Sequence, residues 1–254
     1  MEGATISFVG WIILVLAGFI LGIAKGGLPA ASILAIPLIA LVIPGKAATG
    51  LVLPILILGD LFALAYWRRS ASWKELGRAL PWAIAGIIAG VVFLDRIDDR
   101  FMRPIIGGIV LLLLALHLRR HYLSPAKQEA AVPDDRSRRW VFAAAVGCLG
   151  GFTTMLANAG GAVMSMYFLA LGLSKETFIG TSAWFFFIVN LIKLPLMIRL
   201  GMISGESLGV NLAMVPALAA GTVAGVIIAR RLDQKVFDIA VSVLTAAACL
   251  RLLF

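Results

Sequence analysis

Residues 17–29 read Ala-Gly-Phe-Ile-Leu-Gly-Ile-Ala-Lys-Gly-Gly-Leu-Pro, so an apolar run ends here in a glycine pair followed by a proline. The run begins near residue 6 and approaches the roughly 20 residues that a membrane helix needs. Glycine adopts backbone angles that a helix interior excludes, and Pro29 lacks an amide hydrogen and favours a helix start. The stretch therefore predicts a membrane helix that breaks at Gly26-Gly27 and a second helix that begins directly after the break.

The composition excludes a soluble protein. Of the 254 residues, 61% are hydrophobic and 14% are charged, whereas a soluble domain has about 25% charged residues. Disordered chains are poor in apolar residues, so disorder is excluded as well. The apolar residues form ten long runs without strict alternation, which indicates helices and not barrel strands. We expect an all-α integral membrane protein, with runs at residues 6–24, 28–43, 47–67, 79–94, 104–118, 140–157, 162–173, 177–198, 208–229 and 236–254.

The two halves of the chain resemble each other on either side of a polar stretch at residues 122–139. Five features recur in the same order: Gly26-Gly27 and Gly160-Gly161, residues 46–50 and 175–180, Asp60 and Asn190, Gly86/Gly90 and Gly221/Gly225, and Arg96/Asp98 and Arg231/Asp233. We therefore predict two repeated helical bundles, at residues 1–121 and 140–254, joined by a cytoplasmic linker at residues 122–139.

The arrangement of the two bundles depends on how many runs cross the membrane. Five crossings in each half would invert the second half, as in many secondary transporters, so we expect inverted repeats. Runs 28–43 and 162–173 are shorter than a full span and fit half-helices equally well, so the prediction is eight to ten membrane segments. The motifs Gly86-x-x-x-Gly90 and Gly221-x-x-x-Gly225 are expected to allow close helix crossings.

The formal net charge of +9 comes from short basic clusters between the apolar runs, namely Arg68-Arg69, Arg119-Arg120 and residues 136–139. Basic clusters in this position are typical of cytoplasmic loops, which places residues 67–78 and the linker on the cytoplasmic side. Nucleic-acid binding would need a continuous basic face with exposed aromatic residues, and the pattern lacks one.

Both glycine breaks predict a site for an anion. A break frees backbone N–H groups at the start of the next helix, where the helix dipole is positive. Close packing of small residues is the alternative for one glycine pair, but the recurrence after a helix in each half favours the anion site. Polar residues accompany the glycines: Lys25 at the first break, and Thr153, Thr154, Asn158, Thr181 and Ser182 around the second. Lys25 could instead extend to the membrane surface, and the hydroxyls could instead bond helix carbonyls.

Three further polar residues lie within apolar runs. Asp60 is costly there unless it is protonated, paired or hydrated, so we interpret it as the group that couples transport to protons. The alternative is a structural partner for a cation such as Lys193. Asn190 and Lys193 are three residues apart and share a helix face, where they would offer an amide and a cation to an oxyanion. Lys193 could also extend to the interface.

The chain resembles the TauE/SafE sulfite exporter family. The resemblance rests on residues 17–29, Ile36-Pro37-Leu38, residues 46–50, residues 150–154, residues 158–161 and Gly180-Thr181-Ser182. It implies a multi-pass carrier of the bacterial inner membrane for sulfite, thiosulfate or organosulfonates. We expect the chain to act as an exporter driven by an ion or proton gradient. The chain departs from the family pattern at Ala24-Lys25 and at Leu171.

The motifs of other function classes are missing from the sequence. No Walker loop or nucleophile motif occurs, so we expect neither an enzyme nor ATP-driven transport by this chain alone. Cys148, Cys249, His117 and His121 lack the companions of a metal site, and we predict no metal and no cofactor. The expected partners are a small sulfur-containing anion and the lipid bilayer, with a homo-oligomer as an open alternative. An anion-selective channel is the alternative function.

Overall fold

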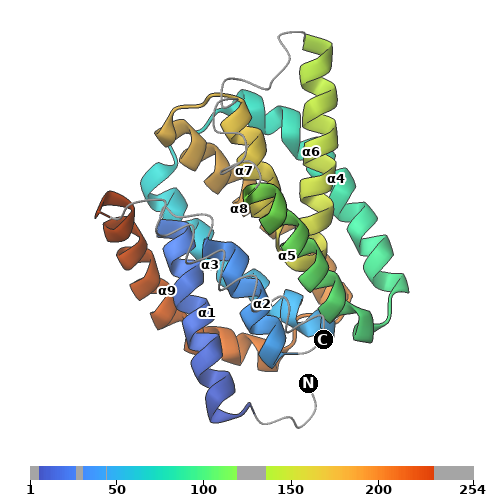
Figure 1. Ribbon diagram of the computed structural model, residues 1–254, viewed down its shortest axis with the longest axis vertical. Helices are drawn as coiled ribbons and strands as arrows, with labels where there is room; N and C mark the ends of the chain where they lie inside the picture. The colour runs from blue at the N-terminus through green and yellow to red at the C-terminus, as the bar shows by residue number, and fades with distance from the viewer. Residues whose placement is uncertain (1–5, 27–30, 44, 119–135, 232–254) are drawn as a thin grey trace.

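The computed structural model describes residues 6–26, 31–43, 45–118 and 136–231, and every regular element within them is helical (Figure 1). The elements are α1 (Phe8–Gly26), α2 (Ser32–Val42), α3 (Gly45–Trp67), α4 (Trp73–Arg96), η2 (Asp99–Phe101), α5 (Met102–Leu118), α6 (Arg136–Ala157), α7 (Gly160–Ala170), α8 (Lys175–Arg199) and α9 (Gly205–Arg231). These helices confirm the all-helical class predicted from the apolar runs. α6 begins within the expected linker, and residues 122–135 of that linker lie outside the described residues.

Within the described part of the chain, six helices are long and apolar enough to cross a membrane: α1, α3, α4, α6, α8 and α9. The described α5 has 17 residues, whereas α2 and α7 have 11 residues each, too few for a full span. The chain is therefore a helical multi-pass membrane protein. The count of eight to ten segments remains a prediction, because the last apolar run, residues 236–254, lies outside the described residues.

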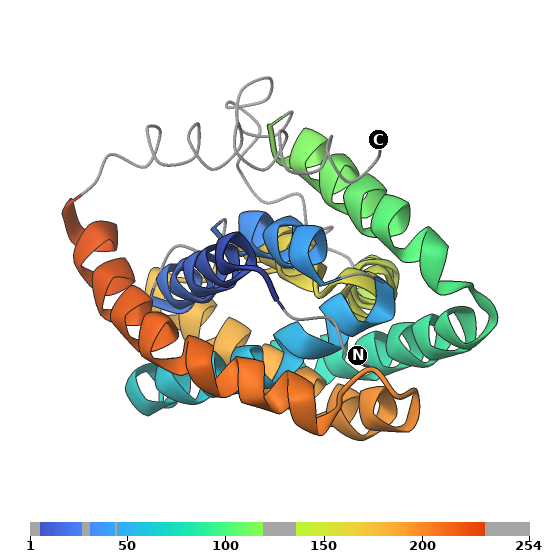
Figure 2. The same ribbon diagram turned by 90° about the horizontal axis from the view of Figure 1, so that it is seen from below.

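Two pairs of helices make the most extensive contacts, α1 with α9 and α4 with α6. Figure 1 shows α9 beside α1 at one side of the molecule and α4 beside α6 at the other. Helices α3 and α8 contact each other between these pairs. In the view of Figure 2, α9 and α4 lie along the outside of the bundle, and α1, α2, α6 and α8 lie further in. The short helix α2 contacts α1, α3 and α5, and the short helix α7 contacts α5, α6 and α8.

Glycines set the short distance within both outer pairs. A methyl group on Gly22 of α1 would collide with the backbone carbonyl of Leu218 in α9. A methyl group on Gly86 of α4 would likewise collide with the carbonyl of Cys148 in α6. Gly221 of α9 meets the backbone of α1 in the same way, which confirms the close crossings predicted for both Gly-x-x-x-Gly motifs. Without side chains at these positions, the paired helices pack backbone to backbone.

We expect Gly86→Ala to destabilise the protein by about 2 kcal/mol, because the added methyl group must push α4 away from α6. Gly77→Ala is the matched control, since Gly77 lies in the same helix and has open space around it. Alanine favours a helix over glycine by about 1 kcal/mol, so the control is neutral or slightly stabilising. Thermal unfolding of the detergent-purified protein measures both effects. Equal melting temperatures for the two variants would contradict the close crossing.

Candidate functional site

The break between α6 and α7 centres on Asn158. Asn158 has φ 50°, a left-handed conformation that no other described non-glycine residue adopts, and asparagine tolerates it better than most residues. Its side-chain Nδ2 donates to the carbonyl of Thr49 at 2.8 Å, and its Oδ1 accepts from Lys193 Nζ at 2.5 Å. Asn158 is thus hydrogen-bonded to both α3 and α8 at this break.

Lys193 is fully buried at the same break. Its ammonium also donates to the carbonyl of Thr154 at 2.8 Å and contacts the Thr154 hydroxyl at 3.3 Å. With the bond to Asn158, these contacts use all three of its N–H donors. The carbonyl of Thr154 belongs to the last turn of α6, where the helix dipole favours a cation. Lys193 therefore stays inside the bundle and stabilises the end of α6.

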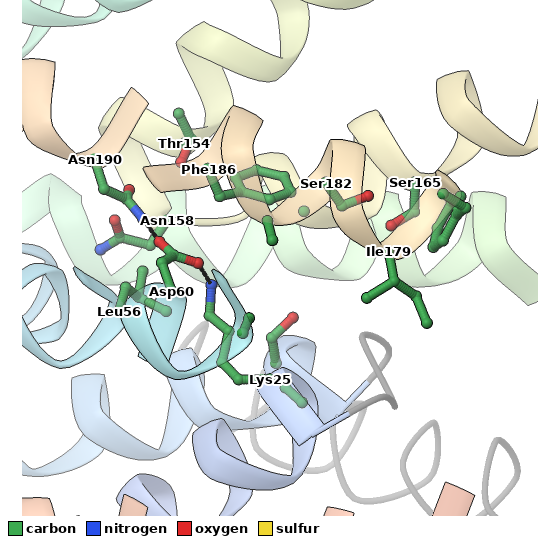
Figure 3. Close-up of a pocket in the computed structure, with 16 residues that line it drawn as sticks. Lys25, Leu56, Asp60, Thr154, Asn158, Ser165, Ile179, Ser182, Phe186 and Asn190 are labelled. Atoms are coloured by element: carbon green, nitrogen blue, oxygen red, sulfur yellow. Dashed lines mark hydrogen bonds and ion pairs between the residues drawn. The ribbon is translucent and has the colours of Figure 1, made fainter. Parts of the chain in front are cut away.

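Asp60 lies at the centre of the bundle with 1% of its surface exposed. Lys25 Nζ forms an ion pair with Asp60 Oδ1, and Asn190 Nδ2 donates to Asp60 Oδ2 at 2.8 Å (Figure 3). The cation paired with Asp60 is therefore Lys25 of α1, whereas the sequence had suggested Lys193 of α8. The three side chains connect α1, α3 and α8.

The side chain of Lys25 passes directly over Gly59 on its way to Asp60, where the missing side chain leaves room for it. A methyl group on Gly59 would lie 2.8 Å from Lys25 Cγ, so a larger residue there would displace the lysine stem. The Lys25 ammonium also lies 5.7 Å from the centre of the Phe186 ring, within the range of a cation–π contact. Lys25 thus extends into the bundle and does not turn back to the membrane surface.

A cavity of about 100 Å³ adjoins these groups, large enough for a small ion or a few water molecules. Residues from α1, α2, α3, α6, α7 and α8 line it (Figure 3): Ala24, Lys25, Ser32, Leu56, Asp60, Ala63, Thr154, Asn158, Gly161, Ser165, Phe178, Ile179, Ser182, Ala183, Phe186 and Asn190. Ser182 Oγ and Asn190 Oδ1 are buried without a hydrogen-bond partner. Such atoms are uncommon in native proteins, and here they leave one hydroxyl and one carbonyl available to a ligand.

The structure brings together about half of the residues predicted for the site. Those that line the cavity are Lys25, Asp60, Thr154, Asn158, Gly161, Ser182 and Asn190. Lys193 lies behind Thr154 and Asn158, outside the lining. Gly27 lies outside the described residues.

The other predicted residues make structural contacts away from the cavity instead. The Thr153 hydroxyl donates to the Leu149 carbonyl at 2.8 Å, the helix bonding that was its alternative interpretation. The Thr181 hydroxyl accepts from the Ser72 amide at 2.9 Å and so fastens the α3–α4 loop to α8. Gly26 packs against the backbone of α9, and Gly160 packs against that of α6. Gly26 and Gly160 therefore serve close helix packing, which was the alternative interpretation of the glycine pairs.

Sequence reasoning missed several members of the site. The Thr49 hydroxyl donates to the Leu156 carbonyl at 2.9 Å, and it belongs to the repeated stretch 46–50, which was a usable signal. Phe186 lies between Ser182 and Asn190 at four-residue spacing, a pattern that places all three on one face of α8. Ser32 and Ser165 had no distinguishing signal. Among the described residues, no three His, Cys, Asp or Glu side chains gather closely enough to hold a metal ion.

The site lies within a chain that matches one family model, described as sulfite exporter TauE/SafE, over residues 14–252. The chain belongs to this family. The match confirms the resemblance inferred from the two glycine breaks and their flanking residues. No curated protein and no solved structure matches the chain. Membership of a transporter family and six apolar helices together describe a multi-pass membrane transporter.

Substitution of Asn158 separates backbone strain from side-chain bonding. Asn158→Gly loses both side-chain hydrogen bonds but relieves the left-handed backbone, whereas Asn158→Ala loses the bonds and keeps the strain. We expect both variants to be less stable than the wild type, and alanine to be the worse by about 1 kcal/mol. Thermal unfolding in detergent gives the order. An alanine variant as stable as the glycine variant would contradict the strained geometry at this break.

Proposed function

We propose that this chain is a secondary carrier of small sulfur-containing anions, namely sulfite, thiosulfate or organosulfonates, in the bacterial inner membrane. The observation that carries the proposal is the largely buried ammonium of Lys25, 16% exposed, on the wall of a cavity, beside hydrogen-bonding groups that have no partner. An oxyanion needs a cation and several donors to replace its hydration shell. Family membership supports a sulfur anion as the cargo, and export under an ion or proton gradient is the direction we favour.

Two helix starts add to the attraction for an anion. Ser32 is the first residue of α2, and Gly161 lies in the first turn of α7. Both line the cavity, and a methyl group on Gly161 would lie 3.8 Å from Ser32 Oγ. The two half-helices therefore begin close together, with the positive ends of their dipoles toward the same cavity. This arrangement supports the anion site proposed from the glycine breaks.

Asp60 is the residue that we propose for proton coupling. It is the one carboxylate in the lining of the cavity, and its counterpart in the second half, Asn190, cannot titrate. Protonation of Asp60 would release Lys25 from the ion pair and leave that cation for the cargo. A carboxylate inside membrane helices is a functional candidate by default, because its desolvation must be offset by a specific role or partner.

The helix contacts support two inverted repeats that move against each other. In the proposed correspondence, α1 matches α6 and α4 matches α9. The close pairs are α1 with α9 and α4 with α6, so the matching helices exchange partners between the two halves. A pseudo-two-fold axis produces this reciprocal exchange. Opposing motion of the halves would open the cavity to one side of the membrane and then to the other.

Transport by the reconstituted protein tests the proposal. Proteoliposomes should take up sulfite, thiosulfate or methanesulfonate with saturation, and an excess of unlabelled anion inside should accelerate uptake. Lys25→Gln should reduce uptake at least about tenfold, because a buried anion loses its cation. Lys74→Gln is the control, since Lys74 is exposed at the start of α4. Absence of uptake for all three anions would refute the carrier, and large non-saturating currents would favour the anion-selective channel.

The pH dependence of thiosulfate transport tests the role of Asp60. Thiosulfate keeps its charge near neutral pH, so a pH effect reports on the protein. We expect uptake to be faster at lower external pH in the wild type, because a proton enters with the anion. Asp60→Asn should remove this dependence and retain exchange of thiosulfate for thiosulfate. An unchanged pH profile in Asp60→Asn would assign Asp60 a purely structural role.

A further inference from the structure

The charges around the cavity do not cancel. Lys25 Nζ forms an ion pair with Asp60, and the three acceptors around Lys193 Nζ suit an ammonium group, so we count two positive charges and one negative charge. The other residues that line the cavity are uncharged. Glu75 is the remaining buried charge among the described residues, and it pairs with Arg78 at 2.6 Å. On this count the residues of the site contribute one net positive charge inside the membrane helices.

The starts of α2 and α7 attract an anion locally, but the helix ends add no net charge to this balance. Each break joins the negative end of one helix to the positive end of the next, as α6 and α7 meet around Asn158. The partial charges of the two ends oppose each other, so formal charges determine the net value. Because an unbalanced charge in an apolar interior is costly, the site is neutral when it holds one negative charge.

Building on the proposed function, we propose that the cavity selects its cargo by charge. A monovalent oxyanion enters without a proton, and a divalent oxyanion enters only together with one proton, which binds to the carboxylate of Asp60. In the first case the anion neutralises the net positive charge directly. In the second case the proton from solution bonds to an Asp60 oxygen and the ion pair with Lys25 is released. The Lys25 ammonium then faces the dianion, and Lys193 adds its charge from behind Thr154 and Asn158.

Asn190 is suited to both states of Asp60. Its Nδ2 now donates to Asp60 Oδ2 at 2.8 Å, as an ionised carboxylate requires. Its Oδ1 is buried and has no partner. A half turn of the amide would present this carbonyl to a protonated Asp60, which then has a hydrogen to donate. A hydrophobic residue in this position would support neither state.

An alternative mechanism makes a different prediction. If every cargo took the place of Asp60 beside Lys25, then Asp60 would need a proton for monovalent and divalent anions alike. Charges from all sides of Asp60 enter this comparison: Lys25 from α1 and Lys193 from α8 act on it, and the lining residues from α2, α6 and α7 are neutral. The number of protons taken up with each anion therefore separates the two mechanisms.

Calorimetric titration of the full-length protein in detergent measures that number. Binding heats in two buffers of different ionisation enthalpy give the protons taken up per anion. Methanesulfonate is a permanent monoanion and thiosulfate is a dianion near neutral pH. We expect no proton with methanesulfonate and about one proton with thiosulfate in the wild type.

Variants extend the test to affinity. Asp60→Asn raises the charge of the site by one, so thiosulfate should bind without a proton and gain about a hundredfold over methanesulfonate. Lys25→Gln combined with Asp60→Asn restores the original charge, and the preference should return toward the monoanion. Asp98→Asn is the matched control, because this carboxylate is 68% exposed, and it should behave as the wild type.

The outcomes are distinguishable. One proton taken up with methanesulfonate as well would overturn selection by charge, as would an unchanged preference in Asp60→Asn. If Asp60→Asn does not fold, the proton counts of the wild type decide the matter alone. Failure of both anions to bind the wild type would refute the proposed function itself.

Discussion

The ion pair between Lys25 and Asp60 is the interaction on which the interior of this protein depends. A carboxylate inside apolar helices needs a partner, and the partner comes from a helix that the chain placed 35 residues earlier. Asn190 satisfies the other carboxylate oxygen from α8. Three helices, α1, α3 and α8, must therefore meet at one point, and the cavity is the space that remains beside this junction.

The break between α6 and α7 imposes the second constraint, because the last carbonyls of α6 need partners inside the bundle. Lys193 and Asn158 meet this need at the end of α6, and Asn158 keeps a left-handed backbone to do so. Glycines in the α1–α9 and α4–α6 pairs allow the backbones of the paired helices to approach closely, so no large side chains separate them. The breaks before α2 and α7 supply the helix starts that face the cavity. The residues and helix starts that complete the structure are therefore those that we propose to attract the anion.

The sequence predicted the helices and the main polar residues because both leave local signals. The length of an apolar run predicts a membrane helix, and the polar residues Asp60, Asn190 and Lys193 are conspicuous within such runs. Which cation pairs with Asp60 depends on how α1 packs against α3, and no local pattern encodes that distance. The position of Lys193 also depends on packing between helices. The three-residue spacing places Lys193 on the same helix face as Asn190, but the end of α6 lies close enough to accept its hydrogen bonds, so Lys193 lies behind the cavity. Thr153 and Thr181 were predicted from proximity to the break, although each bonds a nearby backbone group.

The most direct test of this account is the position of a bound anion. Selenite has the shape and charge of sulfite, and its selenium scatters X-rays anomalously. Crystals grown with selenite should give an anomalous peak inside the cavity, within hydrogen-bonding reach of Lys25 Nζ. A peak confined to exposed arginines, or an empty cavity at saturating selenite, would contradict the assignment of this site.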